Sequence, residues 1–202
     1  MQEAFIGNWP HRPHLSQQHL TSVSGLNRRF LDLAGKDLLS TAWGTHVAPL
    51  TPAQRAAAAE CPYALFDLRF QDDVHWRERL ESAGAWRIGD EPRVGEDTVD
   101  FVRLALFYTW HVASTAGLTA HLLLGMHART ADAFRRVSVD ALPALALSEA
   151  ANLAPRWSRC HAFWSALVDA AARPDPTVLR RVQLSGLQLA AAAQLPSQPR
   201  EV

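Results

Sequence analysis

Histidine is the residue type that first suggests chemistry in this sequence, because nine are present and imidazole is a common metal ligand. His111, His121 and His127 share one apolar region. At about 100° per residue on a helix, His111 and His121 point roughly 80° apart, and His121 and His127 roughly 120° apart. Helical metal sites pair ligands at positions i and i+4, and these three histidines lack that spacing. The pattern therefore predicts no metal site and favours core or surface histidines.

A cysteine beside a histidine is the second arrangement that could do chemistry. Cys160 and His161 are adjacent, and adjacent helical residues point about 100° apart, which is unsuited to a paired nucleophile and base. A glycine-rich phosphate loop and a G-x-S-x-G motif are both missing from the sequence. We therefore expect no catalytic residue, no cofactor and no enzymatic activity.

Arginines gather around a helix, a tight turn and a second helix over residues 128–151, the layout of a helix-turn-helix. Residues 138–154 hold no Lys or Arg, and only Asn152 there is of a type that reads bases, so direct base reading is not expected. The flanking arginines could contact DNA phosphates or a protein partner, or could only keep the helix surface soluble. Together with Trp9 near the N-terminus, the candidate contact residues are Arg129, Arg135, Arg136, Arg156 and Arg159.

The apolar stretch 101–126 supports a different class of function. Its Tyr108, His111 and His121 could line a pocket for a small molecule or cofactor. Arg103 and the two histidines interrupt the stretch, which predicts a buried helix and not a membrane span.

Composition limits the class of protein. A hydrophobic content of 48% with 20% charged residues is typical of a globular chain, and 202 residues make one large domain or two small intertwined ones. The net charge is zero, so no overall field favours nucleic acid or an anionic membrane. Two cysteines fit a reducing compartment, and the N-terminal residues lack the pattern of a secretory signal, so we expect a cytoplasmic protein.

Helix start and stop signals predict an all-α fold of eight or nine helices with no strand. Thr51 to Gln54 has the pattern of a capping box, Asp72 or Asp73 suits a helix start, and Gly125 suits a helix end. Residues 63–70 alternate like a strand but also fit a helix, and we favour the helix. The expected organisation is an irregular arm over 1–14, helical halves over 15–86 and 98–195, and a tail over 196–202.

The two halves share a pattern that predicts an internal repeat. Residues 50–85 and 137–173 each begin with an aliphatic residue and a hydroxyl and continue as an alanine-rich helix. Each then has an arginine followed by an aromatic residue, and a tryptophan six or seven residues further on. The matching residues are Thr51 and Ser138, Arg69-Phe70 and Arg156-Trp157, and Trp76 and Trp164.

The segments 50–70 and 121–149 resemble the D subunit of the bacterial flagellar master transcriptional activator. The similarity is carried by the Leu50-Thr51 helix with its exit at Arg69-Phe70, and by Leu124-Gly125-Met126 before Val137-Ser138. The resemblance implies an all-helical protein that dimerises and works with a zinc-bearing C subunit on promoter DNA. Two copies in one chain would resemble a family dimer fused into a single polypeptide.

From these patterns we expect a non-enzymatic cytoplasmic regulator that acts through protein–protein contacts, in transcription control, with any DNA contact made through phosphates or through the partner. A homo-oligomer is compatible with the repeat. The alternatives are the small-molecule or cofactor binder described above and an adaptor of a secretion or motility system.

Overall fold

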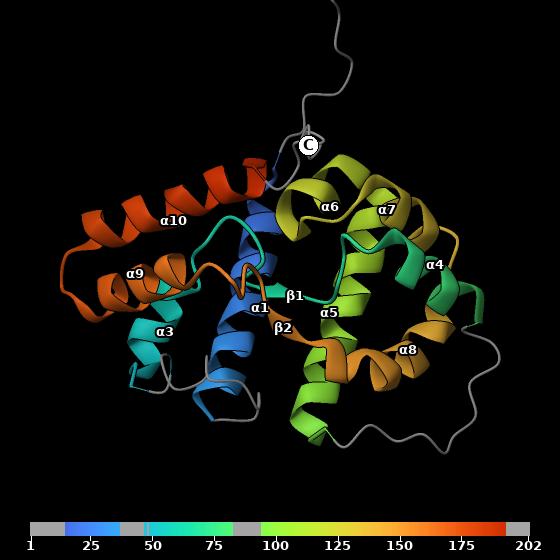
Figure 1. Cartoon of the computed structure of the whole chain (residues 1–202), viewed down its shortest axis with the longest axis horizontal. Coiled ribbons are helices and arrows are strands. Elements are labelled where there is room, and N and C mark those ends of the chain that lie inside the picture. The colour runs from blue at the N-terminus through green and yellow to red at the C-terminus, as the bar shows by residue number, and fades with distance from the viewer. Residues whose placement is uncertain (1–14, 37–46, 48, 83–93, 193–202) are drawn as a thin grey trace, which may run out of the picture.

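The structure, a computed structural model, describes residues 15–36, 47, 49–82 and 94–192. This described part contains nine α-helices and one two-stranded sheet, as predicted for an all-α fold of eight or nine helices (Figure 1). Trp9, the arm over 1–14 and the tail over 196–202 lie outside the described residues. The helices are α1 (Gln17–Gly35), α3 (Pro52–Ala58), α4 (Asp73–Ser82), α5 (Glu96–Thr115), α6 (Gly117–Leu124), α7 (Ala128–Phe134), α8 (Leu142–Glu149), α9 (His161–Ala172) and α10 (Pro176–Ala192).

Local sequence sets several helix ends as predicted. The Thr51 side chain accepts a hydrogen bond from the Gln54 N–H, and the Gln54 side chain accepts one from the Thr51 N–H, which completes the capping box. Asp72 caps α4 by accepting from the His75 N–H at 3.0 Å. Gly125 ends α6 in the left-handed conformation at φ 68°, which favours glycine.

The prediction of a helix over 63–70 is wrong. Strand β1 (Phe66–Asp67) lies in this segment and pairs antiparallel with β2 (Ala154–Pro155), in the register Phe66 to Pro155 and Asp67 to Ala154. The alternating Ala64, Phe66, Leu68 and Phe70 are all fully buried. The partner strand lies 88 positions further along the chain, so no local signal in the sequence points to it.

The turn that follows each strand has the same backbone geometry at positions 88 residues apart. Arg69 and Trp157 both have positive φ, at 58° and 55°. The Trp76 indole N–H donates to the Leu68 carbonyl at 3.0 Å, and the Trp164 indole N–H donates to the Arg156 carbonyl at 2.9 Å. Helix α4 begins at Asp73 and α9 at His161. The same local turn geometry therefore occurs twice, at a spacing of 88 residues.

The match between Arg69-Phe70 and Arg156-Trp157 is wrong by one residue. The repeated geometry pairs Arg69 with Trp157, and Leu68 with Arg156. Phe70 is fully buried, whereas Trp157 is only partly buried, so the two aromatic residues of this match also lie in different environments. The offset arises because Arg69 and Arg156 stand at different distances from the tryptophans that fix each turn, Trp76 and Trp164. The number of residues between arginine and tryptophan differs by one.

The chain crosses between two groups of helices at the sheet (Figure 1). Helix α3 precedes β1 and packs against α9, while α4 follows β1 and packs against α7. We call α4 to α8 the α4 lobe, and α1, α3, α9 and α10 the α9 lobe. Each lobe therefore contains helices from both halves of the sequence, and the lobe boundary does not coincide with the boundary between the halves.

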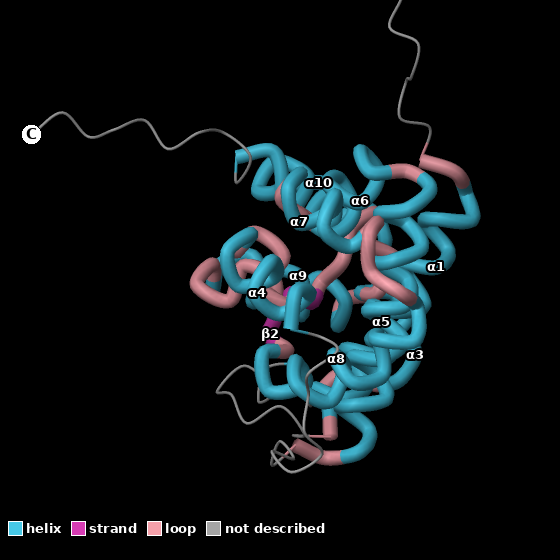
Figure 2. Tube along the Cα trace, turned by 90° about the vertical axis from the view of Figure 1, so that its right-hand side faces the viewer, coloured by secondary structure: helices cyan, strands magenta, loops and turns pink. Residues whose placement is uncertain are grey.

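Buried contacts attach the β1 segment to helices of both lobes. Phe66 of β1 packs edge-on against Phe101 of α5, with ring centroids 5.1 Å apart. Asn27 of α1 is fully buried; its amide donates to the Tyr63 carbonyl at 2.8 Å, and its side-chain oxygen accepts from the Leu65 N–H at 2.7 Å. The strands lie among helices in both views (Figures 1 and 2). No helix in the described residues is both long and apolar enough to cross a membrane.

Candidate functional site

The predicted contact arginines occupy different environments. Arg129 is on α7, Arg135 and Arg136 directly follow that helix, and Arg159 lies in the turn before α9; Arg129, Arg135, Arg136 and Arg159 are all exposed. Arg129 and Arg135 form weak surface ion pairs at 3.5 Å with Asp73 and Asp132 respectively. Arg159 lies apart from the other three, in the turn that follows β2.

Arg156 is buried, and this corrects the expectation that it is a surface arginine beside the helix-turn-helix layout. It is only 5% exposed, and its Nη1 donates to the Leu123 carbonyl at 3.0 Å. The guanidinium lies against Gly125, where an added Cβ would lie 2.3 Å from Nη2. It also stacks on the neighbouring Trp157 ring, with Cζ 4.7 Å from the centroid. Burial lowers the pKa of Arg156 to about 10, so the side chain keeps its charge at neutral pH.

The second helix of the helix-turn-helix layout is poorly suited to reading DNA. This element is η1 (Val139–Ala141) followed by α8, and it buries Leu142, Leu145 and Glu149. Its exposed residues include Leu147, which is 46% exposed and apolar. The Asn152 amide donates to Glu149 at 2.8 Å, so that base-reading donor is engaged. An apolar exposed face suits a protein contact better than base edges.

A groove between α4 and α7 has the strongest features of a contact site among the described residues. The His127 N–H donates to the Phe70 carbonyl at 3.0 Å, which places the start of α7 close to the start of α4. Trp76 of α4 then packs against Phe134 of α7, with ring centroids 4.8 Å apart. These contacts hold the two helices side by side, and the groove between their outer faces has a volume of about 400 Å³.

The walls of this α4–α7 groove carry charges of alternating sign. On α4 the order is Asp73, Arg77, Glu81; on the opposite wall it is Arg129, Asp132, Arg136. Spacings of four and eight residues place the α4 set on one face of its helix, and Arg136, just past the end of α7, continues the line of Arg129 and Asp132. Apolar atoms of Leu80, Ala133 and Val137 complete the lining. The groove therefore offers apolar contact together with charges of both signs.

The residues of the proposed cofactor pocket turn toward different surroundings. The Tyr108 hydroxyl donates to the His19 carbonyl at 3.3 Å, and the His121 ring bonds the Met126 carbonyl oxygen at 2.7 Å. His111 is exposed on α5. The described residues contain no group of three or more His, Cys, Asp or Glu placed to hold a metal ion.

The two cysteines also lie apart. Cys61 is fully buried near α3, and burial raises the pKa of its thiol to about 12, so the thiol stays protonated. Cys160 is partly buried at the start of α9, and the adjacent His161 is exposed.

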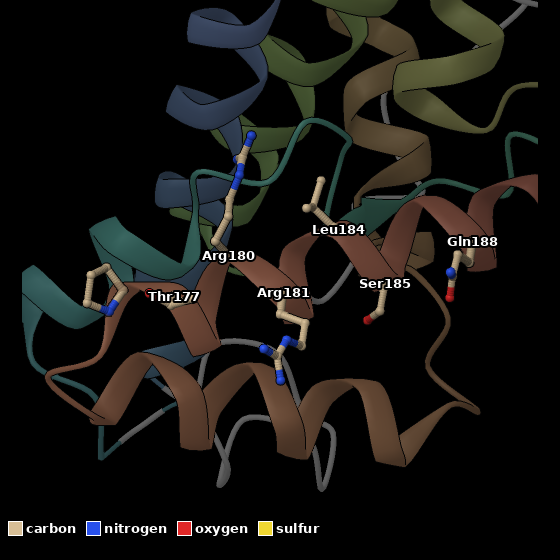
Figure 3. Close-up of a pocket in the computed structure, with 7 residues that line it drawn as sticks. Thr177, Arg180, Arg181, Leu184, Ser185 and Gln188 are labelled. Carbon is tan, nitrogen blue, oxygen red and sulfur yellow. The ribbon is translucent and has the colours of Figure 1, made fainter.

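A second hollow follows the outer face of α10 (Figure 3). Its lining residues all belong to this one helix, and Arg181, Ser185 and Gln188 project from a different side of the helix than Arg180 and Leu184. With no second element forming an opposite wall, it is an open helix surface and a weaker candidate than the α4–α7 groove.

The exposed arginines of one wall of the α4–α7 groove were predicted from the sequence as contact residues, whereas the charged residues of the α4 wall were not. Arg77 and Glu81 follow Asp73 at four-residue intervals, which is a readable helical signal. It was not interpretable alone, because the groove exists only where α4 meets α7.

The chain matches no known protein family, no curated protein and no solved structure.

Proposed function

We propose that this chain is a non-enzymatic regulator that binds another protein through the α4–α7 groove, in the control of transcription. The observation that carries the proposal is the groove itself, in which an apolar floor is bordered by charges of both signs on two helices. Such a surface suits a helical protein segment, which can place one apolar side chain on the floor and charges against the walls.

Charge favours a protein over nucleic acid as the direct partner. A phosphate backbone would meet Asp73, Glu81 and Asp132 as well as the arginines of the groove. A protein segment can present either sign at each position. Any DNA contact by this chain is then limited to phosphates near Arg135 or Arg159, or is made by the partner. The resemblance of two segments to a flagellar transcriptional activator subunit supports transcription as the setting.

Affinity purification from the native host with mass spectrometry tests the proposal. The bait is compared as wild type, as Arg136→Glu in the groove, and as Arg181→Glu on the exposed face of α10, which is the matched control. We expect one partner to be recovered equally by wild type and Arg181→Glu, and at least about tenfold less by Arg136→Glu, because the reversed charge repels the group on the partner that faced the arginine.

Two results would contradict the proposal. Equal recovery with both variants would remove the groove as the contact site. Binding of duplex DNA by the chain alone, with clear sequence preference at physiological salt, would contradict a mechanism based on protein contact.

A small-molecule or cofactor binder is the second candidate, and absorbance and metal analysis of the purified protein test it directly. An adaptor of a secretion or motility system would use the same groove, and the identity of the captured partner would distinguish it from a transcription regulator.

A further inference from the structure

A pocket of about 410 Å³ lies beside the sheet, away from the α4–α7 groove, and the proposed function does not use it. Leu124, Pro155 and Trp157 supply apolar surface, and Ser158 and Gln71 supply neutral polar groups. This mixture of apolar surface with a few polar and charged groups is typical of sites for small ligands.

The charged residues of the pocket give it a positive character. Arg156 and Arg159 line it together with a single acid, Asp67, so two positive charges face one negative charge. Burial raises the pKa of Asp67 above its ordinary value, and its carboxylate is the one acidic group set against the two arginines. A buried charge acts strongly on its surroundings, because little water screens it.

Arg156 also has a hydrogen-bonding group left over. Its Nη1 donates to backbone carbonyls, whereas its Nη2 is buried and has no hydrogen-bond partner among the described residues. An unsatisfied donor on a buried cation is costly, and it needs a partner that brings oxygen. Nη2 is shielded from solvent, so direct contact requires a small shift of the guanidinium, while its charge acts on the pocket without one.

We infer that this pocket, which we call the Arg156 pocket, binds a monoanionic carboxylate attached to an apolar group. The carboxylate pairs with the exposed Arg159 and is attracted by the positive charge of Arg156. The apolar group packs on Leu124, Pro155 and Trp157. Carboxylates of this kind occur on small organic acids and at the C-terminus of a peptide, and both sources present the same group to the pocket.

A titration followed by nuclear magnetic resonance tests this inference, because a ligand of this size binds weakly. The probes are N-acetyl-leucine and its amide, N-acetyl-leucinamide, which share a shape and differ only in the charge of the terminal group. We expect the acid to bind saturably and at least about tenfold more tightly than the amide, since hydrogen bonds to charged groups are the stronger ones.

Three single variants examine the electrostatics. Arg159→Gln should weaken binding of the acid about fivefold, whereas Arg173→Gln, an exposed arginine at the end of α9, should leave it unchanged. Asp67→Asn should tighten binding about threefold, because it removes the one negative charge in the lining while the amide oxygen can still accept from the Phe70 N–H. A variant effect that tightens binding would not arise from damage to the fold.

The inference is overturned if neither probe binds, if acid and amide bind equally, or if Arg159→Gln and Arg173→Gln weaken binding to the same degree. A peptide ending in leucine distinguishes the two sources of carboxylate. Tighter binding of its free-acid form than of N-acetyl-leucine identifies a protein C-terminus, and weaker binding identifies a small acid.

Discussion

Helices α4 and α9 are each held in their lobe by buried residues, but the residues are polar in the α4 lobe and apolar in the α9 lobe. In the α4 lobe, the fully buried Glu149 of α8 accepts from His75 Nε2 at 2.8 Å and from Arg79 Nε at 3.0 Å, both on α4. Positions 88 residues away hold Cys61, Phe163 and Leu167, and all three are buried. A polar cluster therefore joins α4 to its lobe, whereas apolar residues join α9 to its own.

This difference favours the packing of α4 in one lobe and of α9 in the other. Helices α4 and α9 start from the same turn geometry, so the backbone alone does not decide which lobe each one joins. On an apolar surface His75 and Arg79 would lose the Glu149 carboxylate, and burying a charge beside apolar groups is strongly unfavourable. The polar cluster thus disfavours packing of α4 in the α9 lobe and also stabilises its packing in the α4 lobe.

The largest expected effect tests whether the two lobes share an anchor. Trp76→Ala and Trp164→Ala should each lower the free energy of unfolding by about 3–5 kcal/mol, because both indoles are buried and both donate to a carbonyl of the preceding turn. Urea denaturation measures both values. A loss below about 1 kcal/mol for one of them would show that the repeated turn does not stabilise both lobes.

The next largest expected effect distinguishes the α4 lobe from the α9 lobe. Glu149→Gln should lower the free energy of unfolding by about 3 kcal/mol, because it leaves His75 and Arg79 without their carboxylate. Thermal unfolding with calorimetry gives the change, and Arg129→Gln is the control, with an expected loss below about 1 kcal/mol for an exposed ion pair. Equal losses of unfolding free energy in Glu149→Gln and Arg129→Gln would mean that the buried cluster stabilises the fold no more than an exposed ion pair does.

A smaller net effect should follow when the polar cluster is made apolar. The triple variant His75→Phe, Arg79→Leu, Glu149→Met gives the α4 lobe the character of the α9 lobe, and we expect its stability to lie within about 2 kcal/mol of wild type, since apolar replacement of buried ion pairs is often neutral. If the cluster directs α4 to its lobe, this variant should also refold with more than one phase. Single-phase refolding would contradict that role.

The smallest expected effect concerns Asp67 at the sheet. Burial raises the pKa of this carboxyl in the folded state, so the folded protein binds the proton more tightly than the unfolded chain. Stability from this group is present at low pH and is lost as pH rises through the folded pKa. Asp67→Asn should therefore raise the midpoint of urea unfolding at pH 7 but not near pH 3. An equal change at both pH values would exclude titration as the cause.

Local signals predicted helix ends well, because caps depend on residues three or four positions apart. The Thr51 and Gln54 box, the Asp72 cap and the Gly125 stop could all be read from neighbouring letters. The strands could not be read in this way, since Phe66 becomes a strand only by pairing with Pro155. Tertiary pairing overrode a helical pattern there.

The site was less predictable than the fold. Arg156 and Arg159 are similar in sequence context, yet one is buried because Gly125 leaves room for its guanidinium. The α4–α7 groove was half visible, because the arginines of α7 were recognised while their counterparts on α4 belong to the other half of the sequence. Such features depend on which helices meet, and that information is spread across the chain.

The crossing of the chain at the sheet has a consequence for synthesis on the ribosome. The Gln183 amide donates to the Ala57 carbonyl across 126 positions, and the Tyr63 hydroxyl donates to the Gln183 carbonyl across 120. The α9 lobe, which contains α1 and α3 as well as α10, therefore cannot close until α10 has left the exit tunnel. Until then the nascent chain exposes the apolar surfaces of α1 and α3, so the risk of aggregation is highest before synthesis is complete.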